Sequence, residues 1–226
     1  MNGVRDGTTV RIVGGSLMKT IGINLTGGGA RGAYQAGALL GLGELLQELN
    51  LVGERNPVKI WSGNSAGAIN STFMAAHAED FLAGAEKLAT LWRQLTPNRV
   101  YETGLLSMSS NSARWIRDLT FGPLIKRKWA EYLLDTSPLL KLLTDELPFE
   151  KVQEAIAKKR IKAVTCSTYC YSSSETVTFL QAAQKFHWHR RRRRVVNTEL
   201  TPAHILASCS IPLLFPPTQL QRKILW

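Results

Sequence analysis

The chain has 226 residues, of which 44% are hydrophobic and 20% charged, which is ordinary for a globular domain with its own core. Its net charge of +11 is unusual, and Lys185 together with the run Arg190, Arg191, Arg192, Arg193 and Arg194 supplies six of the 28 basic residues. No stretch approaches the roughly 20 apolar residues of a membrane-spanning helix, and the N-terminus lacks the apolar core of a signal peptide. These features exclude an integral membrane protein. They predict a cytoplasmic protein that can associate peripherally with membranes.

The chain is expected to form one domain over residues 20–226, preceded by a flexible leader over residues 1–19 that contains Gly7, Gly14 and Gly15. No internal repeat or linker divides the domain. The three cysteines, Cys166, Cys170 and Cys209, are odd in number and lack metal-ligand spacing. They therefore favour core thiols in a reducing compartment. No metal or organic cofactor is implied.

Short β-branched runs alternate with helical patterns in the first half of the domain. The alternation predicts parallel strands joined by right-handed helical crossovers. We therefore expect an α/β fold of three layers, with a mostly parallel central sheet between helices. The expected strands are 20–26 and 58–62, and the expected helices are 33–49, 66–78 and 79–95.

The second half is less regular. Residues 101–135 mix aromatic and basic side chains, which suits either ordinary helices packed on the sheet or an amphipathic cap that meets lipid; the first interpretation is favoured. Beyond them we expect helices at 137–147, 149–160 and 201–208, and strands at 162–171 and 176–180 that form a hairpin around residues 172–174. The basic segment 181–197 follows this hairpin, and residues 218–226 suit a further strand.

Two glycine-bearing turns dominate the sequence. The first is Gly27-Gly28-Gly29-Ala30-Arg31-Gly32, and the second is Gly63-Asn64-Ser65-Ala66-Gly67. Each follows a predicted strand and precedes a predicted helix, where free backbone N–H groups can bind an anion. In the second turn, the Gly-x-Ser-x-Gly spacing lets a serine occupy a sharp, exposed elbow. A serine nucleophile beside N–H donors is what acyl transfer requires.

These two motifs occur together with Ala207-Ser208-Cys209-Ser210-Ile211-Pro212 and Phe215-Pro216-Pro217. In this order they resemble the patatin-like phospholipase family from about residue 20 to residue 217. The resemblance implies a serine lipid acyl hydrolase with a Ser-Asp dyad, acting on phospholipids or glycerolipids. Ser65 matches the nucleophile, within an elbow made of Gly63, Asn64, Ala66 and Gly67. The backbone of Gly27, Gly28, Gly29 and Arg31 matches the oxyanion loop.

The family's catalytic aspartate lies in an Asp-Gly element soon after the segment that matches Phe215-Pro216-Pro217. No aspartate follows Asp145 here, and Asp80, Asp118, Asp135 and Asp145 do not match the motif. We therefore expect the dyad to be incomplete within residues 1–226, and this stretch alone to have little or no activity. A non-catalytic fragment that binds a lipid surface stays open as an alternative.

An α/β-hydrolase with a Ser-His-Asp triad is a second alternative, with His187, His189 or His204 as the base. Only one strand precedes the serine turn, whereas that fold usually places several before it. His204 and His77 are expected to be structural or solvent-facing.

Two further alternatives concern binding. The first glycine turn also satisfies Gly-x-Gly-x-x-Gly, the signature of a dinucleotide-binding module. Such a module needs an acidic residue at the end of its second strand, where this chain has Ser62-Gly63, and Glu54 precedes that strand. The arginine run mixes charge with Phe186 and Trp188, but no nucleic-acid fold motif accompanies it, which disfavours nucleic acid. A solvated basic loop is the favoured interpretation of the run, and anionic phospholipid is the favoured binding partner.

Overall fold

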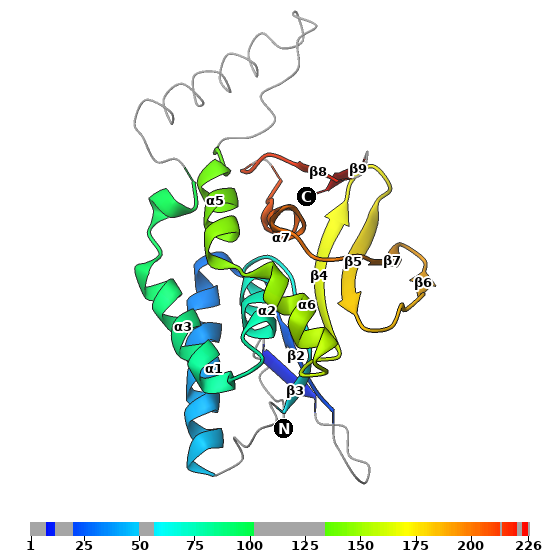
Figure 1. The fold of residues 1–226 in the computed structure, drawn as a ribbon. Helices are drawn as coiled ribbons and strands as arrows, with labels where there is room; N and C mark the ends of the chain where they lie inside the picture. Colours follow the sequence, from blue (N-terminus) through cyan, green and yellow to red (C-terminus); the bar gives the residue numbers. More distant parts are fainter. Residues whose placement is uncertain are drawn as a thin grey trace, which may run out of the picture.

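The computed structural model of the protein describes residues 8–11, 20–49, 57–101, 134–212, 214–220 and 223–225. Within these ranges the strands form one sheet with the order β1-β2-β3-β4-β5-β7-β6, and β9 joins it at β4 (Figure 1). The strands are β1 (Thr8–Arg11), β2 (Ile21–Leu25), β3 (Val58–Gly63), β4 (Ala163–Cys170), β5 (Glu175–Ala182), β6 (His189–Arg190), β7 (Arg193–Asn197), β8 (Thr218–Leu220) and β9 (Lys223–Leu225).

Parallel pairing runs through the centre of the sheet, where β2, β3 and β4 lie side by side. A second parallel pair joins β5 to β7. Antiparallel pairs attach β1 to β2, β5 to β4, β6 to β7 and β9 to both β4 and β8. The predicted α/β fold, with a parallel centre flanked by helices, is confirmed.

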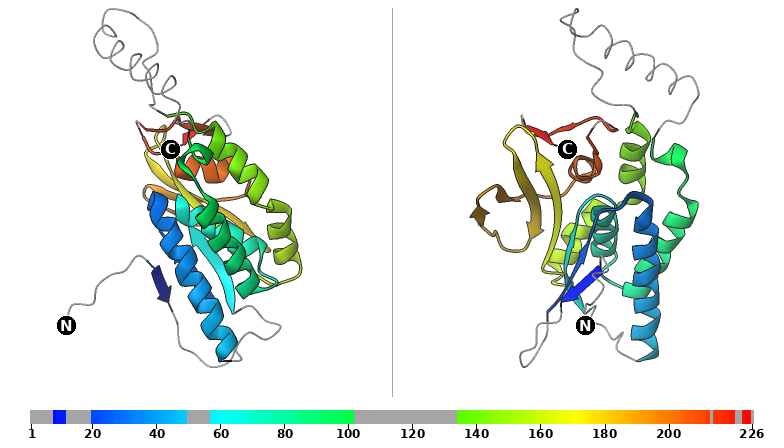
Figure 2. Two further views of the ribbon diagram at one scale, coloured as in Figure 1. Left: turned by 90° about the vertical axis from the view of Figure 1, so that its left-hand side faces the viewer. Right: turned by 180° about the vertical axis from the view of Figure 1, so that it is seen from behind.

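The helices are α1 (Gly32–Glu48), α2 (Ala66–Ala76), α3 (Phe81–Gln94), α5 (Ser137–Glu146), α6 (Phe149–Ala157) and α7 (Pro202–Cys209), with 3-10 turns η1 (Gly29–Arg31) and η2 (Pro97–Arg99). Helices α1 and α3 lie side by side in both views of Figure 2. None of the helices in the described ranges is long and apolar enough to cross a membrane.

Helix α2 is the centre of the core, and every residue from Ala66 to Ala76 is buried. Its small side chains allow close packing against β2, β3 and β4, while α6, α3 and α1 cover it from the other side. Under it, the ring of Trp61 in β3 is fully buried and stacks on Phe81 of α3 with centroids 6.2 Å apart. The three cysteines are buried and free, as expected.

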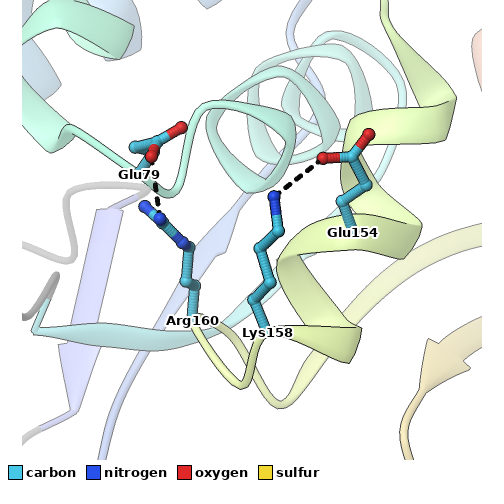
Figure 3. A network of polar contacts seen from close by, with 4 residues as sticks. All are labelled: Glu79, Glu154, Lys158 and Arg160. Carbon is cyan, nitrogen blue, oxygen red and sulfur yellow. Dashed lines mark hydrogen bonds and ion pairs between the residues drawn. The ribbon is translucent and has the colours of Figure 1, made fainter.

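Two ion pairs lie near the C-terminal end of α2. Arg160 Nη2 lies 2.7 Å from Glu79 Oε1, and Lys158 Nζ lies 3.1 Å from Glu154 Oε2 (Figure 3). The first pair ties the turn before α3 to the segment after α6. Because these charges flank the C-terminal end of α2, they are remote from Ser65 at its N-terminus.

Four predictions about local structure need correction, and a fifth falls outside the described residues. The expected leader contains β1, whose sequence Thr-Thr-Val-Arg is rich in β-branched residues. The expected basic loop is instead the β6–β7 hairpin, and residues 218–225 form the β8–β9 hairpin rather than one strand. Helix α6 ends at Ala157, before the three basic residues expected inside it. The amphipathic segment 102–133 lies outside the described residues.

Candidate active site

The two glycine turns lie next to each other at the carboxyl end of the parallel strands. Leu25, the last residue of β2, pairs with Gly63, the last residue of β3. A β-carbon built on Gly27 would lie 3.1 Å from the Ser65 β-carbon and 2.9 Å from Asn64 Nδ2. The first turn therefore packs directly against the second, and glycine at position 27 allows this contact.

Ser65 occupies a strained elbow between β3 and α2. Its φ of 52° and ψ of −128° fall where non-glycine residues are rare. Two glycines make this turn possible, since a β-carbon on Gly63 would overlap the Gly67 carbonyl and one on Gly67 would overlap the Leu25 carbonyl. The Gly-x-Ser-x-Gly segment therefore forms a sharp turn between β3 and α2. Such strain is typical of functional positions.

Ser208 in α7 braces the elbow from the other side. Its Oγ accepts a 2.7 Å hydrogen bond from the Ser65 backbone N–H and donates a 2.6 Å bond to the Ser167 carbonyl in β4. The motif Ala207-Ser208-Cys209-Ser210-Ile211-Pro212 is therefore hydrogen-bonded to the Gly-x-Ser-x-Gly turn through the Ser208 side chain. We did not assign Ser208 a role from the sequence, although it lies inside that motif.

The Ser65 side chain faces a groove of about 390 Å³. Near this side chain, burial raises the pKa of the Cys209 thiol to about 12. That thiol is neutral at physiological pH and cannot act as a base. The groove is lined by Asn64, Ser65, Ser167, Thr168, Tyr169, Tyr171, Thr176, Ser208, Ser210, Ile211 and Pro212.

Several backbone N–H groups in the two glycine turns have no partner among the described residues. Within the described residues, no hydrogen bond satisfies the backbone N–H of Gly27, Gly28 or Gly29, and the same holds for Ala66 at the start of α2. The N–H of Arg31 differs, because it donates 3.1 Å to the Gly28 carbonyl and closes the 3-10 turn. In the described parts of the two turns, the unpaired backbone N–H groups therefore include those of the three glycines and of Ala66.

Among the described residues that line the groove there is no acid and no histidine. Asp80 caps α3 by accepting from the Ala83 N–H, Asp135 accepts from Ser137, and Asp145 borders a separate cavity near His77. Asp118 lies outside the described residues. The aspartates that the structure describes therefore do not complete a dyad with Ser65.

His204 has a structural role instead of a catalytic one. Its Nδ1 accepts from the Thr201 N–H at 3.1 Å in a capping box, and its ring packs edge-on against Phe179. Burial lowers the pKa of this imidazole. His187 is exposed, and the described structure gives it no place in the groove. The Ser-His-Asp alternative thus receives no support from these side chains.

The arginine run lies at the edge of the sheet that borders the groove. Arg193 pairs with Thr176, and Thr176 pairs in turn with Tyr169; the last two residues line the groove. Arg190, Arg191, Arg192 and Arg193 are exposed, whereas Arg194 Nε lies 3.4 Å from Glu175 Oε2. The guanidinium of Arg190 covers the Trp188 ring at 5.5 Å. Strand pairing therefore places Arg193 beside Thr176, a residue that lines the groove, which the sequence pattern did not predict.

The comparisons with known proteins agree with the motifs. The profile of the family described as patatin-like phospholipase matches residues 24–226. Curated protein sequences give no significant match. Among solved structures, the crystal structure of VipD from Legionella pneumophila is 12% identical with a TM-score of 0.48, over 100% of this chain and 49% of that one. The chain thus spans about half the length of that protein. From the family match over nearly its whole length, the chain belongs to the patatin-like phospholipase family.

Proposed function

We propose that the chain is a serine acyl hydrolase that cleaves ester bonds of phospholipids or glycerolipids, with Ser65 as its nucleophile. The observation that carries the proposal is the strained Ser65 elbow packed against Gly27 in a chain of this family. Ser65 Oγ attacks the ester carbonyl carbon while its proton passes to a base. The alcohol then leaves with a proton, and water hydrolyses the acyl-serine ester to release a carboxylic acid.

The oxyanion of the tetrahedral intermediate is proposed to bind the N–H groups of Gly27, Gly28, Gly29 and Ala66. Their lack of partners among the described residues supports this role, since they need no rearrangement to receive a charge. The N-terminus of α2 adds the positive end of a helix dipole at the same place. Arg31 contributes through the turn that its N–H closes.

The base is proposed to be an aspartate outside residues 1–226, as the family's dyad implies. The described aspartates support this, since Asp80 and Asp135 accept hydrogen bonds elsewhere and Asp145 borders a separate cavity. Strand β9 also pairs with Cys170, next to the groove residues Tyr169 and Tyr171, so a segment that follows it would lie near Ser65. A longer form that includes an Asp-Gly-Gly segment should therefore hydrolyse a short nitrophenyl ester much faster than residues 1–226. Equal rates would place the base within residues 1–226.

Contact with an anionic lipid surface is proposed for the β6–β7 hairpin. The exposed arginines of this hairpin and the exposed Phe186, which precedes it, combine charge with an apolar ring, as interfacial segments do. Because the hairpin borders the Ser65 groove through Thr176, a surface bound there would bring ester bonds close to the nucleophile.

The experiment that tests the proposed function uses the longer form that includes an Asp-Gly-Gly segment, called the full-length protein below. It compares this protein with its Ser65→Ala variant on phosphatidylcholine vesicles and on nitrophenyl butyrate. We expect the variant to lose hydrolysis of both, by at least the roughly 10²–10³-fold that loss of one oxyanion donor costs. Unchanged hydrolysis by a folded variant would contradict the proposal. Release of a fatty acid from the vesicles would identify the lipid as substrate.

A further inference from the structure

Three polar side chains form a connected cluster inside the core, behind the glycine-rich turn. Asn70 of α2 is 0% exposed and Gln35 of α1 is 7% exposed, and Trp92 of α3 is partly buried beside them. A buried amide costs free energy unless it is hydrogen-bonded. Such a cluster in the buried core therefore needs an explanation.

The hydrogen bonds of the cluster end on both sides of the glycine-rich turn. Gln35 Nε2 donates 2.7 Å to the Thr26 carbonyl, just before Gly27. Asn70 Nδ2 donates 3.0 Å to the Gly32 carbonyl, just after Arg31, and 3.1 Å to Gln35 Oε1. The indole N–H of Trp92 donates 2.7 Å to Asn70 Oδ1 and orients that amide. The cluster thus fixes both ends of the turn to α2.

The bond from Gln35 also sets the direction of a proposed oxyanion donor. The Thr26–Gly27 peptide is trans, so its C=O and N–H point in opposite directions. Because the carbonyl points toward Gln35 in the core, the N–H of Gly27 points away from the core. Gly27 lies against Ser65, and its N–H has no partner among the described residues.

Close packing also fixes the glycine-rich turn against α2 and α3. A β-carbon on Gly32 would overlap the Trp92 ring and would lie 2.9 Å from Ala66 Cβ, the residue after the nucleophile. Asn70 follows Ser65 by five residues in a helix that is buried throughout. The turn, the elbow and Trp92 therefore cannot shift independently, because densely packed interiors transmit displacements.

We propose that Gln35, Asn70 and Trp92 are positioning residues, which hold the glycine-rich turn so that its N–H groups meet the oxyanion formed at Ser65. This inference rests on the proposed acyl hydrolase function. Its basis is that one hydrogen-bonded cluster holds the two carbonyls that flank the turn and is anchored in the helix that carries Ser65.

The test uses Gln35→Met, which keeps the side-chain volume but removes the amide, in the full-length protein. We measure kcat and KM for nitrophenyl butyrate, the inhibition constant of a trifluoromethyl ketone that forms a tetrahedral adduct, and the melting temperature. We expect kcat to fall by about 10- to 100-fold, the scale for a misplaced catalytic group. The inhibition constant should rise by a similar factor while KM stays close to wild type, since only the tetrahedral state uses the donors.

Gln181→Met is the matched control. Gln181 is 5% exposed and also bonds through both ends of its amide, to Gln153 Oε1 and from the Leu200 N–H, but in a part of the core away from the turn. It should lower the melting temperature and leave kcat unchanged. If Gln35→Met behaves in the same way, with lower stability and an intact kcat, the positioning role is overturned.

Trp92→Phe is the second variant, which decides the question if Gln35→Met fails to fold. It removes the indole donor to Asn70 and keeps a ring against Gly32, and we expect a smaller change of the same kind. An intact kcat in Trp92→Phe would overturn the inference. Ser65→Ala separates the two proposals: if it abolishes hydrolysis while the cluster variants do not affect kcat, only the positioning role fails.

Discussion

The backbone N–H of Ser65 donates a 2.7 Å hydrogen bond to the hydroxyl of Ser208, a residue 143 positions later in the chain. The same hydroxyl donates to the Ser167 carbonyl in β4. A strained turn is therefore held from outside by α7 and the central sheet. Backbone strain persists only where surrounding structure over-determines it, and Ser208 supplies part of that restraint.

Replacing Ser208 by alanine should loosen the elbow. The variant leaves the Ser65 N–H without its partner, which we expect to lower the free energy of unfolding by about 1–3 kcal/mol. A displaced nucleophile should also reduce kcat by roughly tenfold, with KM less affected. Urea unfolding and ester hydrolysis measure the two effects.

Ser71→Ala is the control for that variant. Ser71 is buried in α2 and donates 3.2 Å to the Ala68 carbonyl, without touching the elbow. It should keep the wild-type kcat. If Ser208→Ala keeps its kcat as well, Ser208 is a packing residue and does not support the nucleophile.

Alanine in place of glycine should have opposite effects at two positions. At Gly63 the new β-carbon would overlap the backbone of Gly67, so we expect a loss of at least about 3 kcal/mol or failure to fold. At Gly37, in the exposed face of α1, no atom lies within 4 Å, and alanine should stabilise the helix by up to about 1 kcal/mol. Melting temperatures test both, and a tolerated Gly63→Ala would contradict the close approach at the elbow.

The sequence predicted the parts of the site that depend on local geometry. Both glycine turns lie between a strand and a helix as predicted, the first between β2 and α1 and the second between β3 and α2, because small residues and β-branched runs act over a few positions. The contact from Ser208 to Ser65 spans 143 positions, and no local pattern encodes it. Ser208 was nevertheless visible inside a motif, which is the signal that could have indicated its role.

Two of the strands that the sequence did not predict, β7 and β1, have physical explanations. Arg193 and Arg194 belong to β7, although consecutive arginines are typical of exposed loops; parallel pairing with β5 overrides that tendency. Thr8–Arg11 forms β1 by pairing with β2, although four residues amid glycines suggested a leader. Asn70 offered a further signal: an amide within a helix of small apolar residues marks a buried polar contact.

Neutralising the arginines of the β6–β7 hairpin should weaken binding to anionic vesicles. Each exposed basic residue near such a surface contributes about 1 kcal/mol, so changing Arg190, Arg191, Arg192 and Arg193 to Gln should reduce affinity by more than tenfold. The salt dependence of binding should also fall. Cosedimentation with phosphatidylserine vesicles measures both, and hydrolysis of a small soluble ester should not change.

The matched control removes four charges elsewhere. Lys141, Lys151, Lys158 and Lys159 are exposed on α5, on α6 and just after α6, so their change to Gln lowers the net charge equally. If both sets weaken vesicle binding to the same extent, net charge alone drives it, and the hairpin is not a specific docking surface.

The pH dependence of stability should report on His204. Burial lowers the pKa of this imidazole in the folded state, so below about pH 6.5 the unfolded chain binds more protons than the folded one. Its contribution to stability is therefore complete above that pH and is lost as the pH falls toward the lowered folded pKa. His204→Gln keeps a side-chain acceptor for the capping box but does not titrate.

Between pH 7 and pH 5, the melting temperature of His204→Gln should thus fall less than that of the wild type. His77, whose pKa burial also lowers, stays as a common background in both proteins. If the melting temperatures of the two proteins fall by the same amount between pH 7 and pH 5, His204 does not titrate as its buried position requires. Hydrolysis by His204→Gln at pH 7.5 should remain, because a Ser-Asp dyad does not use this imidazole.

The central claim is that Ser65 is the nucleophile of an acyl hydrolase. The most direct measurement is labelling of the full-length protein with a fluorophosphonate, followed by digestion and mass spectrometry to find the modified residue. We predict one adduct, on Ser65, and no labelling of Ser65→Ala. An adduct on any other residue, or undiminished labelling of the alanine variant, would contradict the claim.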